Sequence, residues 1–100
     1  MSQEEFSKAL TKKSTEVSRV LKSLSHPVRL KILCFMIDQE RSVNELTKFC
    51  DISQSAMSQF LNRMKGEGLI VSRREQNFVY YSVARKDLIK LLKAIKENLC

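Results

Sequence analysis

The sequence of 100 residues contains only two glycines, one proline and no tryptophan. Folds made of many short strands use glycine and proline at their turns, so this scarcity argues against a β-sandwich or barrel and favours helices. Long apolar runs are also absent, because the longest, Ile32–Ile37, is far shorter than the roughly 20 residues that a membrane-spanning helix needs. The polar, acidic start Met1–Glu5 shows no signal peptide, and we therefore expect a cytoplasmic protein without a membrane partner.

Histidine and cysteine are scarce as well, with one histidine and three cysteines. His26 directly precedes the only proline, Pro27, which suits the first position of a helix, so we interpret His26 as a residue that starts a helix. The cysteines are odd in number, include no Cys-x-x-Cys pair and are expected in a reducing compartment. They therefore do not predict a disulfide framework.

Positive charge, in contrast, is abundant. Eighteen lysines and arginines against eleven acidic residues give a net charge of +7. The excess is spread along the chain, with nine basic and six acidic residues in 1–50 and nine and five in 51–100. A basic body of this kind favours a polyanionic partner, either nucleic acid or an anionic membrane.

Hydrophobic periodicity predicts a single domain, 1–100, that is mainly α with a small β-hairpin, in the order α-α-α-α-β-β-α. We expect helices at about 6–24, 27–38, 43–50, 54–65 and 85–99, and strands at 69–74 and 78–83 joined by a turn at 75–77. Ser42 and Glu45 form a capping box, and Ser53 caps the fourth helix. Gly66 and Gly68 are each expected to end that helix with a positive φ.

The third and fourth predicted helices, followed by the hairpin, form a winged helix-turn-helix, a unit that sets its second helix in the major groove of DNA. The apolar stripe of the fourth helix leaves an outward face of small and amide side chains, and no acidic residue lies between 52 and 65. Amides pair with adenine, and hydroxyls donate to phosphates or base edges. The candidate DNA-binding residues are Gln54, Ser55, Ser58, Gln59, Asn62 and Arg63, with Arg73 and Arg74 on the wing.

Two segments make the sequence recognisable. Residues 24–33 (LSHPVRLKIL) and 53–61 (SQSAMSQFL), the latter followed by GLI at 68–70, resemble the ArsR/SmtB family of winged-helix repressors. The resemblance implies a homodimer, paired through the first and last helices, that binds operator DNA until an inducer arrives. It also implies that Gln54, Ser55, Ser58 and Gln59 read DNA. Phe60 stands where many members have histidine, and we expect it to pack inward.

The metal sites of that family are not reproduced here. One needs a Glu-Leu-Cys-x-Cys pattern, but residues 45–50 read ELTKFC. The other needs Asp-x-His, but residues 87–89 read DLI. With His26 as the only imidazole, the usual cages for soft or borderline metals cannot be assembled, and no metal cofactor is expected.

Cys34 and Cys100 resemble the two thiols of the BigR, HlyU and YgaV branch of the family. The resemblance implies a sensor of reactive sulfur species or oxidants, in which a disulfide or polysulfide between the two cysteines releases the operator. Lys31, Lys93 and Lys96 are near enough in sequence to lower a thiol pKa. Cys50 continues an apolar stripe and is interpreted as a core residue.

Three alternatives remain open at this point. The protein could be a repressor with another inducer, such as arsenite bound by three thiols, or with none. A second alternative is a thiol enzyme such as a peroxidase using Cys34, but no general base or anion-binding loop accompanies this cysteine and no enzyme is expected. The third is a winged helix that binds proteins rather than DNA.

Overall fold

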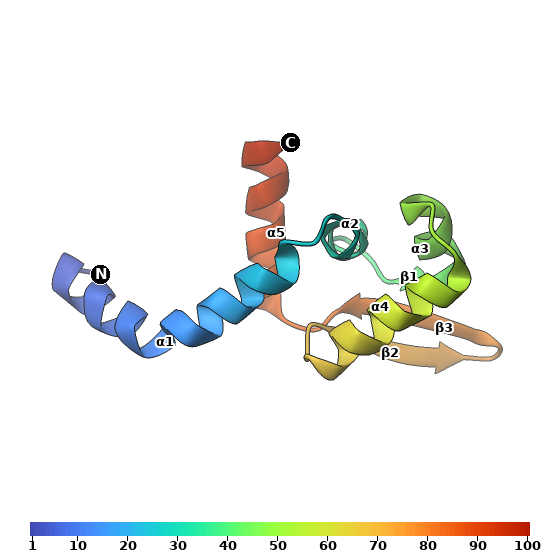
Figure 1. The fold of residues 1–100 in the computed structure, drawn as a ribbon, viewed down its shortest axis with the longest axis horizontal. Coiled ribbons are helices and arrows are strands. Elements are labelled where there is room, and N and C mark those ends of the chain that lie inside the picture. The colour runs from blue at the N-terminus through green and yellow to red at the C-terminus, as the bar shows by residue number, and fades with distance from the viewer.

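The computed structural model describes all 100 residues and confirms a mainly helical winged domain with one small antiparallel sheet (Figure 1). None of its helices combines the length and apolar character needed to span a membrane. The elements, in chain order, are α1 (Gln3–Leu24), α2 (Pro27–Phe35), β1 (Arg41–Ser42), α3 (Val43–Cys50), α4 (Gln54–Gly66), β2 (Ile70–Glu75), β3 (Phe78–Val83) and α5 (Lys86–Leu99).

The helix starts follow their local sequence signals. Ser42 and Glu45 form the predicted capping box at the start of α3, and the Ser53 hydroxyl accepts from the amide of Ala56 at 3.1 Å to cap α4. His26 caps α2, because its Nδ1 accepts from the amide of Val28 at 3.2 Å. Each of these side chains satisfies a backbone donor that the first turn of a helix leaves unpaired.

Several boundaries differ from the sequence expectation by one to three residues. The first helix begins at Gln3 instead of 6, and β2 covers Ile70–Glu75 instead of 69–74. The second helix ends at Phe35 instead of 38, and the Phe35 carbonyl accepts from the Arg41 Nε at 3.0 Å, which satisfies one of the free carbonyls of the last turn. Gly66 still belongs to α4, so only Gly68, at φ +77°, takes the left-handed conformation. The last helix begins at Lys86, with Arg85 in extended conformation before it.

The sheet has three strands rather than two, in the order β1-β3-β2. β2 and β3 form the predicted hairpin, with Ile70 opposite Val83 and Glu75 opposite Phe78. The added strand β1 pairs antiparallel with β3, with Arg41 opposite Tyr81. A strand of two residues is too short to show an alternating pattern, so sequence periodicity could not reveal it.

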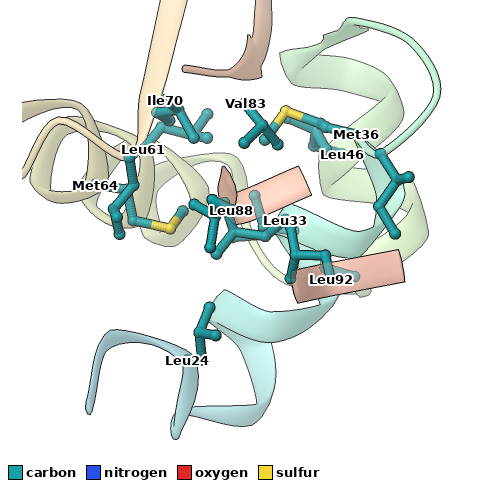
Figure 2. Close-up of a cluster of buried hydrophobic side chains, with 14 of the residues drawn as sticks. Leu24, Leu33, Met36, Leu46, Leu61, Met64, Ile70, Val83, Leu88 and Leu92 are labelled. Carbon is teal, nitrogen blue, oxygen red and sulfur yellow. The ribbon is translucent and has the colours of Figure 1, made fainter. Parts of the chain in front are cut away.

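The core lies where α2, α3, α4, α5 and the sheet meet, and Figure 2 shows their side chains gathered around Leu33 and Leu88. Leu33, Leu46 and Leu92 are fully buried. As predicted, α2 is the central helix, since α1, α3 and α5 all pack against it. This arrangement fixes the orientation of α4 and the position of the wing.

α1 extends away from this core, as Figure 1 shows. Every residue from 1 to 19 is exposed, and Leu24 is the only buried residue of the helix. Its apolar stripe is uncovered in the single chain: Phe6 is 51% exposed and Leu21 54%.

Candidate nucleic-acid interface and thiol pair

The orientation of α4 is set by its buried side. Met57, Leu61 and Met64 are at most 1% exposed and hold one side of the helix against the core. Because an α-helix turns once every 3.6 residues, Ser55, Gln59 and Asn62 lie on the opposite side of the helix and face away from the core. The outward side carries the predicted DNA-binding residues, all of them exposed: Gln54, Ser55, Ser58, Gln59, Asn62 and Arg63. The structure therefore brings these six side chains to one helix surface.

The wing is joined to α4 at one margin of that surface. The Lys65 Nζ donates to the Ser72 hydroxyl at 2.8 Å, which connects the last turn of α4 to β2. The two predicted wing arginines, Arg73 and Arg74, come directly after Ser72 within β2, and both are exposed. They nevertheless lie in different electrostatic surroundings.

Arg73 is occupied by two carboxylates. Its Nε donates to the Glu40 Oε2 at 2.8 Å and its Nη1 to the Glu75 Oε2 at 2.8 Å, while the guanidinium stacks over the Tyr80 ring at 4.8 Å. The hydrogen bonds that Arg73 donates lower the pKa of Glu40, and because Glu40 and Glu75 accept them, the same bonds raise the pKa of Arg73. Arg73 thus ties the wing to the loop that precedes β1.

No sequence pattern indicates the Glu40–Arg73 pair, because 33 residues separate the two. The pairing divides the chain's arginines into two groups. Four are in ion pairs with carboxylates: Arg29, Arg41, Arg73 and Arg85. The other three form no ion pair: Arg19, Arg63 and Arg74. A phosphate that binds one of these three does not have to displace a carboxylate.

Phe60 packs inward as predicted. It is half-buried against the core, and its ring centroid lies 5.2 Å from that of His26, with the planes tilted by 59°. The aromatic ring therefore connects α4 to the start of α2.

Cys34 and Cys100 belong to two segments that pack together, because Cys34 lies on α2 and Cys100 directly follows α5, which packs against α2. Cys34 is half-buried on α2, whereas Cys100 is exposed directly after α5. Burial raises the pKa of the Cys34 thiol, the nearby Cys100 raises it further, and Lys96 lowers it. Of the three lysines named from sequence, Lys96 is thus the one that acts on Cys34, but desolvation outweighs it.

Cys50 is a core residue, 5% exposed, as predicted. Burial raises the pKa of the Cys50 thiol, while Lys31 lowers it. Nowhere in the chain do three or more histidine, cysteine, aspartate or glutamate side chains form a group that could hold a metal ion.

Residues 26–72 match the family model described as "Bacterial regulatory protein, arsR family". The chain is 36% identical over 92 residues to the biofilm growth-associated repressor of Agrobacterium fabrum, covering 92% of this chain and 79% of that protein. It is 32% identical over 91 residues to the transcriptional activator HlyU of Vibrio cholerae, covering 91% of this chain and 84% of that protein.

Solved structures agree. The transcriptional repressor BigR of Xylella fastidiosa superimposes with a TM-score of 0.87 at 32% identity, covering 100% of this chain and 98% of that one. A domain of Mb0332 from Mycobacterium bovis, described as a homodimeric winged helix-turn-helix DNA-binding domain, gives a TM-score of 0.72 at 29% identity. That match covers 96% of this chain and 84% of the other.

Proposed function

The chain belongs to the arsR family of bacterial regulatory proteins, and we propose that it is a homodimeric repressor with a thiol switch. The relatives that it matches are transcriptional regulators and not enzymes. In the reduced state it binds operator DNA. Linkage of Cys34 to Cys100, by a disulfide or a longer sulfur chain, releases the operator. Reactive sulfur species or oxidants are the inducers.

In the DNA-bound state, α4 lies in the major groove. Gln54, Gln59 and Asn62 carry amides that can read base edges, while Ser55 and Ser58 donate to phosphates or bases. Arg74 contacts the backbone from the wing, where it has no carboxylate partner to displace. In a homodimer, two copies of α4 read half-sites about 34–36 Å apart.

The switch is supported above all by the packing of α5 on α2 together with the effect of Cys100 on the pKa of Cys34, although the two cysteines lie 66 positions apart in the sequence. The proposed link itself requires Cα atoms about 4.4–6.8 Å apart when it is a plain disulfide. The three-thiol alternative gains no comparable support, since Cys50 lies in the core and its pKa responds to Lys31 and to neither of the other cysteines.

The exposure of the two thiols suggests an order of reaction. Cys100 is exposed, so its thiolate attacks first, taking the terminal sulfur of a persulfide RSSH and releasing the thiol RSH. Cys34 then attacks the inner sulfur of the Cys100 persulfide, which forms the disulfide and releases hydrogen sulfide. With peroxide, Cys100 becomes a sulfenic acid and Cys34 displaces water from it. A second persulfide that adds sulfur before closure gives a longer bridge.

The link acts on DNA binding through α2. This helix packs against both α5 and α3, the first helix of the helix-turn-helix, so a covalent bond between Cys34 and Cys100 displaces the element that supports α4. A change in the separation of the two reading helices costs operator affinity. An allosteric coupling of about 1–3 kcal/mol corresponds to roughly 5–150-fold weaker binding.

The test combines intact-mass spectrometry with a DNA mobility-shift assay on the reduced protein after treatment with persulfide, disulfide or peroxide. Wild type should gain an intramolecular link and lose DNA binding, and dithiothreitol should reverse both changes. Cys34→Ser and Cys100→Ser should bind DNA but remain bound after treatment, whereas the control Cys50→Ser should respond like wild type. Release that persists in Cys34→Ser would contradict the thiol switch and assign induction to another chemistry.

A further inference from the structure

A cleft of about 880 Å³ lies between the C-terminal half of α1, the start of α2 and α4. Its walls carry more positive than negative side chains: Arg19, Lys22, Arg29, Arg63 and Arg85 against Glu16 and Glu67. Gln59 of the outward surface of α4 lines the cleft as well. The cleft therefore continues directly from the surface that carries the candidate DNA-binding residues.

The positive residues of the cleft are not equivalent. Arg29 is paired with Glu67, and Arg85 is paired with Asp87 at 2.8 Å. Arg19, Lys22 and Arg63 are exposed and form no ion pair. Two of these three unpaired cations come from α1, an element outside the helix-turn-helix and its wing.

The dimensions of DNA make this side of α4 important. The major groove is about 12 Å wide, and a helix with its side chains is about 10–12 Å across, so a helix in the groove has one sugar-phosphate strand along each flank. The wing lies at one margin of α4, where Lys65 bonds to Ser72. The cleft lies at the other margin, beside Gln59 and Arg63.

We infer that this cleft binds the phosphate backbone of the operator strand that runs along the side of α4 away from the wing, and that Arg19 and Lys22 of α1 contact its phosphates. The inference rests on α4 lying in the major groove, but not on the thiol switch. It makes α1 part of the DNA-binding surface.

The apolar stripe of α1 does not compete for the same side of the helix. Arg19 lies two positions from Val17 and two from Leu21, and residues two apart point to nearly opposite sides of an α-helix. A partner protomer that covers Val17 and Leu21 therefore leaves Arg19 free to face DNA.

The salt dependence of operator binding tests the inference in the reduced, full-length protein. Each phosphate contact contributes about 0.9 to the slope of log affinity against log salt concentration. Arg19→Gln combined with Lys22→Gln should therefore make the slope less steep by about 1.8 for each bound protomer. Operator and unrelated DNA should both be bound more weakly, because phosphates carry no sequence information.

A charge-matched control uses two exposed, unpaired lysines of α5, Lys90→Gln with Lys93→Gln. These changes remove the same charge from residues that do not line the cleft and should leave the slope near that of wild type. An unchanged slope in the Arg19/Lys22 variant would overturn the inference. Inorganic phosphate could also bind saturably to wild type and not to that variant while the slope for DNA stays the same. The cleft would then bind free phosphate and not the DNA backbone, and the inference would be overturned. Gln59→Ala tests separately whether α4 lies in the major groove. If this variant keeps the preference for operator over unrelated DNA, the assignment of α4 as the reading helix is wrong.

Discussion

The winged core and the first helix use the same apolar periodicity but bury it to different degrees. In α4, Leu61 is 1% exposed and Met64 is fully buried, whereas in α1, Phe6 is 51% exposed and Leu21 54%. Isolated helices are marginal in water, and most helical stability comes from packing of the apolar side. The core therefore buries its apolar side chains within one chain, whereas α1 buries its apolar stripe only when another surface covers it.

α5 passes from one of these regions to the other. Near its start Leu88 is 2% exposed and Leu92 is fully buried, but Leu99 near its end is 79% exposed. Cys100 follows directly in the uncovered region, while Cys34 lies on a helix of the core. A link between the two cysteines therefore joins the self-contained region to the region that depends on a partner.

Substitutions in the winged core should change the free energy of unfolding most. Leu61→Ala opens a cavity in the core and should lower the free energy of unfolding by about 2–5 kcal/mol, as leucine-to-alanine changes in cores do. Urea denaturation followed by circular dichroism measures it. Leu21→Ala removes the same atoms from the uncovered stripe, and at concentrations where the protein is monomeric it should leave the unfolding midpoint nearly unchanged. Equal losses in the two variants would show that the contrast between the regions is wrong.

The uncovered apolar stripe of α1 should control self-association of the protein. An apolar side chain that becomes buried contributes about 1.5–3 kcal/mol, so Leu10→Glu should weaken self-association by more than tenfold. Sedimentation velocity across a concentration series reads this as a shift from dimer to monomer. Thr15→Glu adds the same charge to α1, nearly opposite Val17, and should leave the dimer intact. A dimer that withstands Leu10→Glu would place the partner interface elsewhere.

Features set by local contacts and features set by long-range contacts differ in how far sequence could predict them. Local contacts within a few residues set some helix limits, for example through the Ser42–Glu45 capping box. They also set the side of α4 that faces outward. The strand β1, the Glu40–Arg73 pair and the cleft beside Arg19 depend on segments far apart in sequence, and only the folded chain reveals them. Family resemblance predicts the thiol pair, whereas the packing of α5 on α2 that relates the two cysteines is a long-range contact of the folded chain.

A smaller effect separates the two wing arginines. Arg74→Ala removes a cation without a carboxylate partner, and the salt slope of operator binding should become less steep by about 1. Arg73→Ala should act on the wing instead, by loosening β2 from the loop that contains Glu40, and hydrogen exchange of the β2 amides should become faster. Glu40→Gln weakens the same connection and should reproduce the exchange effect of Arg73→Ala but not the slope change of Arg74→Ala. Identical behaviour of the two arginine variants in both assays would remove the distinction.

The smallest expected effect is a pH dependence at the boundary between the regions. The pKa of Cys34 lies above its ordinary value of 9.0, chiefly through burial and then through Cys100, so the folded state favours the neutral thiol. The stability that this contributes is fully present below about pH 9, the ordinary pKa, and is lost as the pH rises through the higher folded pKa. Alkylation of Cys34 by iodoacetamide, followed by peptide mass spectrometry, should therefore accelerate at a higher pH than that of an unfolded thiol.

Substitution at the two neighbours tests the causes of that shift. Cys100→Ser removes a group that raises the pKa of Cys34 and should move the alkylation profile to lower pH, whereas Lys96→Gln removes the group that lowers it and should move the profile to higher pH. Lys90→Gln, on the same helix but not among the causes of the shift, should leave the profile in place. If Cys100→Ser also left the alkylation profile in place, the two thiols would not be neighbours in solution. The exposed end of α5 would then lack the contact through which it is proposed to act on the core.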